Sequence, residues 1–179
     1  MDTTISTRKM VSMAMLIAIS VVLVYFVHLP FPPAPFLEYD PADIPILIGA
    51  FVFGPSAGLL LTILASVIQG ITVSSGSGWI GIVMHIFATG CCAVAAGSIY
   101  QKNPSMKQAA IALVVGALLQ TAAMVVMNLI FTPLFMNQPL DTVLAMIVPI
   151  IIPFNLLKAG VNCLVTLLLF RSIGKAVRA

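Results

Sequence analysis

Long apolar runs constrain this chain more than any other feature of its sequence. Six stretches carry few or no charges: residues 10–28, 42–53, 56–73, 79–100, 108–135 and 142–172. Hydrophobic residues make up 61% of the chain, which has only eight basic and five acidic side chains, and the mean hydropathy is +1.17. About 20 apolar residues cross a bilayer as a helix. The sequence therefore predicts an all-α integral membrane protein with six transmembrane helices, in a single membrane domain over residues 1–179.

Local signals mark where these runs begin, turn and end. The first run follows basic residues, as a signal peptide does, but it lacks a small-residue cleavage site before a soluble domain, so we expect a first membrane helix. The second run is too short for a straight span, and Gly54–Pro55 predicts a turn after it. It therefore either stops short or pairs with the third run as a helical hairpin. Residues 74–78 (SSGSG) predict a flexible link, and Pro133 predicts the end of the regular fifth helix.

Basic residues set the expected orientation. They lie before the first run, between the fourth and fifth, and after the sixth: Arg8, Lys9, Lys102, Lys107, Arg171, Lys175 and Arg178. Cytoplasmic loops of membrane proteins carry an excess of Lys and Arg. With both termini in the cytoplasm, all seven of these residues fall on that side, and Glu38, Asp40 and Asp141 fall outside.

Lys158 is the remaining basic residue, and it lies near the middle of the last apolar run. An ammonium group at such depth costs roughly 3 kcal/mol on insertion scales. Asn155, Lys158 and Asn162 are spaced i, i+3, i+7 and share one helical face. The acids nearest to membrane depth are Asp40 and Asp43, at the start of the second run. Lys158 therefore either pairs with one of them or meets a polar ligand.

Other polar residues form stripes in the apolar runs. The third run has Thr62, Ser66 and Gln69; the fifth has Thr121, Asn128 and Thr132; Thr166 continues the stripe of the sixth. These stripes should face the bundle interior, since lipid offers no hydrogen-bond partners, although such residues often bond only to neighbouring helices. His85 is either a satisfied core residue or part of a pocket floor. The cysteines Cys91, Cys92 and Cys163 fit core packing better than a metal or redox site.

The connection at residues 30–45, PFPPAPFLEYDPADIP, is long, proline-rich and aromatic. Prolines reduce the entropy that a loop loses on ordering, and Phe31, Phe36 and Tyr39 supply flat apolar area. We expect a lid over a pocket that opens outward. The alternative is an interfacial loop with an aromatic belt.

Four segments of the sequence resemble one transporter family. They are TRKMVSMAMLIAIS near the start, FLEYDPADIPILIGAFVFGPSAG around the second run, MNLIFTPLF in the fifth and PFNLLKAGVN in the sixth. The first segment includes Ala14 and Ala18, a small-xxx-small pair that allows close helix approach. The chain resembles the substrate-binding S components of energy-coupling factor (ECF) vitamin transporters, and among these it is most similar to the riboflavin-specific members.

This resemblance implies a function and a set of site residues. A six-helix protein in the bacterial cell membrane would bind riboflavin tightly from outside, under the loop between the first two spans, and deliver it through an ATP-driven complex. Ala14 and Ala18 would dock on a transmembrane coupling subunit, which two ATPase subunits energise. Asn128, Asn155 and Lys158 match residues that hold the flavin. The expected site also includes Asp40, Tyr39, Phe36 and His85.

Three other functions are open at this stage. An enzyme is disfavoured because the chain has no H-E-x-x-H motif and no G-x-x-x-x-G-K-[ST] phosphate loop, and we expect no catalytic residue, metal, cofactor or nucleic-acid partner. A small secondary transporter is disfavoured because no Asp or Glu lies deep within a span. An S component for another vitamin or flavin, such as FMN, folate or pantothenate, is the third possibility.

Overall fold

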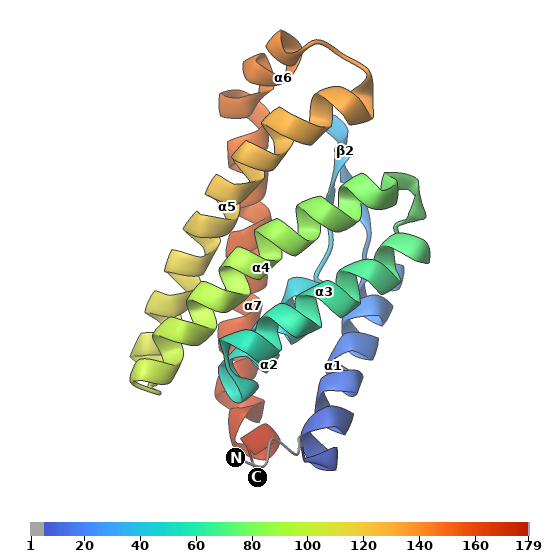
Figure 1. Cartoon of the computed structure of the whole chain (residues 1–179). Coiled ribbons are helices and arrows are strands. Elements are labelled where there is room, and N and C mark those ends of the chain that lie inside the picture. The colour runs from blue at the N-terminus through green and yellow to red at the C-terminus, as the bar shows by residue number, and fades with distance from the viewer. Residues whose placement is uncertain (1–5, 179) are drawn as a thin grey trace.

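The structure is a computed structural model that describes residues 6–178, with side chains to residue 172. It is mostly helical, and its elements follow one another as α1 Thr7–Phe26, β1 Leu29–Phe31, β2 Ala34–Tyr39, α2 Asp43–Phe53, α3 Pro55–Ile71, a 3-10 turn at Ser75–Ser77, α4 Gly78–Lys102, α5 Met106–Met136, α6 Leu140–Met146, a π-helical turn at Ile147–Ile151, and α7 Ile152–Arg178. Figure 1 shows the long helices α4, α5 and α7 as one bundle beside α1, α2 and α3.

The predicted helical runs match these elements closely, with three differences. The fold is not strictly all-α, because residues 29–39 form a two-stranded antiparallel hairpin with a register shift at Pro30/Phe31. Pro133 does not end the fifth helix: α5 continues to Met136, and Asn137 then adopts a left-handed conformation. A proline near a helix end removes only one backbone hydrogen bond, which the surrounding helix tolerates. The SSGSG segment includes a 3-10 turn and the start of α4.

Helices α2 and α3 form a helical hairpin, one of the two arrangements that the sequence left open. Gly54 turns the chain with a φ of +96°, a conformation that favours glycine, and Pro55 begins α3 at a position where no backbone donor is needed. At 1.5 Å per residue, the 11 residues of α2 extend only about 16 Å. Every residue of α2 from Asp43 to Phe51 is buried. The helix is therefore enclosed by protein, and its short length does not have to match the bilayer.

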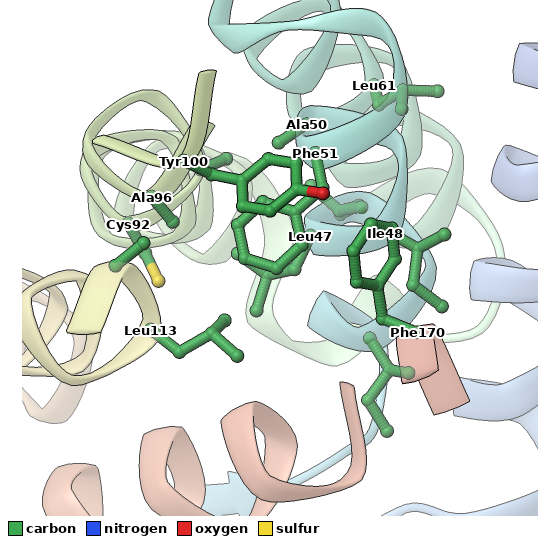
Figure 2. Packing of buried hydrophobic residues seen from close by; sticks show 14 of the residues in the cluster. Leu47, Ile48, Ala50, Phe51, Leu61, Cys92, Ala96, Tyr100, Leu113 and Phe170 are labelled. Atoms are coloured by element: carbon green, nitrogen blue, oxygen red, sulfur yellow. The ribbon is translucent and has the colours of Figure 1, made fainter. Parts of the chain in front are cut away.

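The main apolar core surrounds this enclosed helix. Phe51, Tyr100 and Phe170 bring three aromatic rings from α2, α4 and α7 together, with ring centroids 4.5 to 5.4 Å apart (Figure 2). The buried Cys92 and Cys163 belong to the same cluster, as predicted for core cysteines, whereas Cys91 is exposed. Gly58 and Gly97 permit the close approach of α2, α3 and α4, since an added Cβ would meet backbone or Cβ atoms of Ala50 or Pro55.

A second apolar cluster holds the hairpin on the bundle. Ala34 and Leu37 of β2 pack with Val143, Ile151 and Phe154 of the α6–α7 segment. The ring centroids of Phe31 and Phe154 lie 5.2 Å apart. The π-helical turn around Pro149 immediately precedes this contact, and a proline there removes a backbone donor from the helix. The hairpin thus covers one end of the polar interior.

Four helices or helical segments in the described part of the chain are long and apolar enough to cross a membrane: Thr7–Phe26, Ser75–Lys102, Met106–Met136 and Leu140–Ser172. The shorter apolar helices are α2 and α3. The start of α1, the α4–α5 turn and the end of α7 all lie toward the lower end of Figure 1. These ends carry the basic residues named above, except that the side chains of Lys175 and Arg178 lie outside the described residues.

Candidate ligand-binding site

One cavity gathers most of the predicted site residues. It lies between β2, α3, α4, α5 and α7 and has a volume of about 170 Å³. Of the seven residues predicted to bind substrate, six line it: Phe36, Asp40, His85, Asn128, Asn155 and Lys158. The polar stripes of α3, α5 and α7 are buried as predicted. The helical spacing of these residues therefore identified the interior faces correctly.

Lys158 has a protein partner in addition to its place in the cavity wall. Its Nζ atom donates to Asp40 Oδ2 at 2.6 Å and to the carbonyl of Glu38 at 3.2 Å. The two side chains of the ion pair are 14% and 17% exposed. Of the two acids that the sequence offered as partners, the structure selects Asp40. An ammonium group has three donors, so one proton is left for a further acceptor.

The two asparagines are held in defined orientations by their own helices. Asn128 Nδ2 donates to the carbonyl of Met124 at 2.7 Å, and its Oδ1 accepts from Thr132 at 2.8 Å. Asn155 Nδ2 donates to the carbonyl of Ile151 at 2.8 Å. A carbonyl can only accept, so each amide nitrogen is assigned by its partner. The Asn155 oxygen is thereby directed away from the helix backbone.

Asp43 is the centre of a buried polar network that the sequence did not reveal. It is 1% exposed, and its carboxylate accepts from four side chains: Thr89 at 2.7 Å, Gln120 at 2.9 Å, His85 at 3.2 Å and Asn162 at 3.3 Å. These donors come from α4, α5 and α7. Asp43 lies at the start of a helix, as the sequence indicates, and it is nevertheless interior because α2 is enclosed by protein.

His85 uses both ring nitrogens within the protein. Nε2 lies 3.2 Å from Asp43 Oδ1, and Nδ1 lies 2.8 Å from Ser66 Oγ. Ser66 is itself 2.6 Å from the carbonyl of Thr62. His85 lines the cavity, but its hydrogen-bonding atoms are already paired, so it offers a ligand its ring surface more readily than a nitrogen.

Tyr39 is the predicted site residue that the structure does not bring to the cavity lining. Its hydroxyl donates to Asn162 Oδ1 at 3.1 Å, while Asn162 Nδ2 donates to the carbonyl of Asp40 at 3.0 Å. Burial, and then the neighbouring Asp40 carboxylate, raise the pKa of Tyr39 above its usual 10.0. The hydroxyl therefore stays protonated at neutral pH, and its hydrogen bond links the end of β2 to α7.

Several cavity-lining residues were absent from the predicted site. Gln69, Thr89 and Gln120 all line the cavity and are at most 5% exposed. Gln69 belongs to one of the predicted polar stripes, whereas Gln120, which precedes Thr121 in the chain, does not. A glutamine within an apolar membrane run nevertheless needs a hydrogen-bond partner, and this requirement alone indicates an interior position for Gln120.

Ala14 and Ala18 lie on α1, which contributes no residue to the cavity lining. Both are exposed on α1, and the exposed residues Met10, Met15 and Ile19 flank them on the same helix. The opposite side of α1 packs on α2 and α3. The alanine pair thus lies on an outward surface that a neighbouring membrane helix can approach.

Comparison with known proteins identifies the family. Residues 8–170 match the family described as the ECF transporter, substrate-specific component. The chain is 31% identical to the riboflavin transporter RibU of Streptococcus thermophilus, over 86% of this chain and 76% of that protein. It is 27% identical to RibU of Staphylococcus aureus, over 96% and 93% of the two chains, and 29% identical to the riboflavin transporter FmnP of Bacillus subtilis, over 91% and 90%.

A solved structure agrees with these sequence matches. It is described as the S component of a bacterial ECF transporter, and it superposes with a TM-score of 0.82 at 26% identity, over 98% of this chain and all of that one. The matched relatives are transport proteins and not enzymes. The apolar helices are those of a multi-pass membrane protein. The chain therefore belongs to the family of substrate-specific S components of ECF transporters.

Proposed function

We propose that this chain is the high-affinity riboflavin-binding S component of an ECF transporter in a bacterial cell membrane. The observation that carries the proposal is the convergence of Asn128, Asn155 and Lys158 on one cavity beneath the hairpin. Relatives that are named riboflavin transporters support the choice of ligand. In this proposal the chain is one membrane domain with six spans and both termini in the cytoplasm, as its basic helix ends suggest.

The cavity has the chemistry that a flavin requires. The isoalloxazine ring has carbonyl acceptors and an imide N–H, and the free proton of Lys158 can be donated to a ring carbonyl or a ribityl hydroxyl. Phe36, Phe135 and Phe154 supply apolar walls for the dimethylbenzene end. A mostly apolar pocket with a few placed polar groups is the usual form of a small-molecule site.

The hairpin is the proposed lid of this pocket. The cavity of about 170 Å³ is smaller than the roughly 300–1,000 Å³ of typical small-molecule sites. A flavin therefore requires the hairpin or the side chains around the cavity to move outward. Phe36, Leu37, Glu38 and Asp40 of this segment line the cavity, so displacement of the hairpin would enlarge it directly.

Transport requires partners in this proposal. The chain has no phosphate-binding loop for ATP, so energy must come from two ATPase subunits through a transmembrane coupling subunit. The exposed Ala14 and Ala18 on α1 would form the docking surface. Riboflavin is the transported ligand and not a cofactor.

The proposal is tested by purifying the protein in detergent and recording its absorbance spectrum, followed by calorimetric titration without ATP. We expect a yellow flavin chromophore or saturable binding of riboflavin. Saturation by folate or pantothenate without any response to riboflavin would leave the family assignment intact and replace the ligand, and tighter binding of FMN would make the phosphorylated flavin the substrate.

A small secondary transporter is the second candidate, and the buried Asp43 carboxylate is the observation that favours it. The isolated chain in liposomes distinguishes the two. An S component should bind riboflavin without accumulating it, whereas a proton-coupled carrier should accumulate it when a pH gradient is imposed.

A further inference from the structure

Gln120 is a buried polar residue without an assigned role. It lies in α5, is 5% exposed and lines the cavity. Its side chain contacts the Asp43 network rather than its own helix backbone. This distinguishes it from Asn128 and Asn155, whose amide nitrogens both bond to carbonyls of their own helices.

The orientation of the Gln120 amide is determined by its partner. Its Nε2 atom donates to Asp43 Oδ2 at 2.9 Å. A carboxylate only accepts hydrogen bonds, so the nitrogen must face Asp43 and the oxygen must face the other way. Thr89 and Asn162 also donate to Asp43. Asp43 is thus held from α4 and α7, and since both of its oxygens are acceptors, neither of them can pair with the glutamine oxygen.

The oxygen of this amide is open to the cavity. Among the described residues, no group donates to Gln120 Oε1. Every solvent-inaccessible side-chain nitrogen or oxygen of the described residues does have a hydrogen-bond partner. The unpaired Oε1 atom must therefore be accessible, and the cavity that Gln120 lines provides this access. An acceptor directed into a largely apolar pocket is a recognition group, because leaving it unpaired beneath a bound ligand is unfavourable.

We infer that Gln120 binds the ligand through Oε1, which accepts a hydrogen bond from an N–H or O–H group of the ligand. Asp43 is the positioning residue that keeps this oxygen turned toward the cavity. The inference rests on the proposed riboflavin-binding function and extends it. Riboflavin has two kinds of donor, the imide N–H of the ring and the hydroxyls of the ribityl chain. A site built around such a bond rejects analogues that lack the donor.

Calorimetric titration of the full chain in detergent tests the role of Gln120. Gln120→Met keeps the side-chain length and removes the acceptor. The ligands are riboflavin, 3-methylriboflavin, which lacks the imide N–H, and lumiflavin, which lacks the ribityl hydroxyls. Gln120→Met should weaken riboflavin binding about tenfold, the scale of one hydrogen bond. For the analogue without the relevant donor, the variant and the unchanged protein should bind equally.

Thr121→Val is the matched control for this substitution. Thr121 is the neighbouring residue of α5, is also buried, and donates within its helix to the carbonyl of Ala117 at 2.9 Å. It does not line the cavity. Its replacement removes a buried polar group from the same helix, and riboflavin affinity should stay within about twofold, since only local helix bonding is lost.

The positioning role of Asp43 is tested by non-additivity. Asp43→Asn replaces an acceptor with an amide, so the Gln120 amide is free to reverse and direct its nitrogen into the cavity. Asp43→Asn should weaken riboflavin binding about tenfold, and adding Gln120→Met should then cause no further loss, since the oxygen is already misdirected. Melting temperatures confirm that each variant is folded, and the Gln120→Met titrations decide the ligand contact even if Asp43→Asn does not fold.

Three results would overturn the inference. The first is riboflavin binding by Gln120→Met within twofold of the unchanged protein. The second is an equal loss for all three flavins, which indicates a change of pocket shape and not a lost hydrogen bond. The third is failure of the unchanged protein to bind any flavin, which overturns the proposed function together with this extension of it. The first two leave the proposed function in place.

Discussion

Lys158 shows how one buried charge can serve both structure and recognition. Its ion pair with Asp40 joins α7 to the residue just after β2, and Lys158 also lines the cavity, where a ligand oxygen could accept its remaining proton. A part-buried charge needs a partner at all times. The protein supplies Asp40, and a bound ligand can share the ammonium group without leaving it unpaired.

Lys158→Met should therefore lower both stability and affinity. The ligand-free protein should lose about 2 kcal/mol, the scale of a charged hydrogen bond, because Asp40 is left unpaired. Adding Asp40→Asn should restore most of the melting temperature but not riboflavin affinity, since the ligand contact is still missing. Recovery of affinity as well as stability in the double variant would show that Lys158 acts only through its ion pair.

Tyr39 is predicted to act on ligand exchange and not on ligand contact. It lies outside the cavity lining, and its hydroxyl fastens the hairpin to Asn162 at 3.1 Å. Tyr39→Phe should raise the riboflavin dissociation rate about fivefold to tenfold, since one hydrogen bond of the closed hairpin is lost.

Stopped-flow flavin fluorescence measures this rate, and the buried Thr121→Val serves as the control on a different element. An unchanged dissociation rate would show that the Tyr39 hydroxyl does not hold the hairpin closed, and that its apolar cluster and the Lys158 contacts are sufficient. That cluster includes Leu37, Phe31 and Phe154.

At the scale of elements, the α2–α3 hairpin and the β1–β2 hairpin position the site from two sides. In the first hairpin, α2 is enclosed by protein, and its first residue, Asp43, lies among the polar faces of α4, α5 and α7. The strands of the second hairpin place Phe36 and Asp40 over the same space. Each hairpin depends on a short turn and not on a long helix.

Gly54→Ala should destabilise the α2–α3 hairpin. Gly54 has a φ of +96°, and an added Cβ would meet the side chain of Gln101. We expect a loss of about 1–2 kcal/mol, the scale of a strained backbone conformation, measured as a lower melting temperature in detergent.

Gly160→Ala is the matched control, because nothing lies within 4 Å of its added Cβ and its position in the interior of α7 favours alanine. It should leave stability unchanged or raise it slightly. Equal destabilisation by both substitutions would mean that the conformation of Gly54 contributes nothing specific.

At the scale of the whole molecule, the proposed ligand-binding cavity and the proposed docking surface lie on different elements. The cavity is enclosed by β2, α3, α4, α5 and α7, whereas Ala14 and Ala18 are exposed on α1. This separation allows the ligand to be bound by the isolated chain before any complex forms.

Ala14→Trp or Ala18→Trp should block assembly with the coupling subunit and leave riboflavin affinity within about twofold, since a bulky residue prevents close helix approach. Co-purification measures the first effect and calorimetry the second. Ala122→Trp, on the exposed side of α5, controls for adding an aromatic residue to the membrane-facing surface. Loss of binding with intact assembly would exchange the roles of the two surfaces.

The sequence alone was sufficient to locate the apolar helices and their interior faces. Polar residues such as Asn155, Asn162 and Thr166 recur at helical spacing within an apolar run, and their burial follows because lipid cannot satisfy them. Spacing of the same kind predicted that Asn128 and Lys158 each face the interior, and both line the cavity. The turn at Gly54 followed from local chain chemistry.

Only the tertiary structure decided which of these faces meet and how their groups pair. Asp40 and Lys158 are 118 positions apart, and Asp43 and Gln120 are 77 apart; no local spacing links such residues. Strand pairing in the hairpin likewise depends on the surface beneath it, where Leu37 packs on Phe154 and its neighbours. Helical periodicity specifies the direction of a side chain around its own axis, whereas its partner depends on the packing of all the helices together.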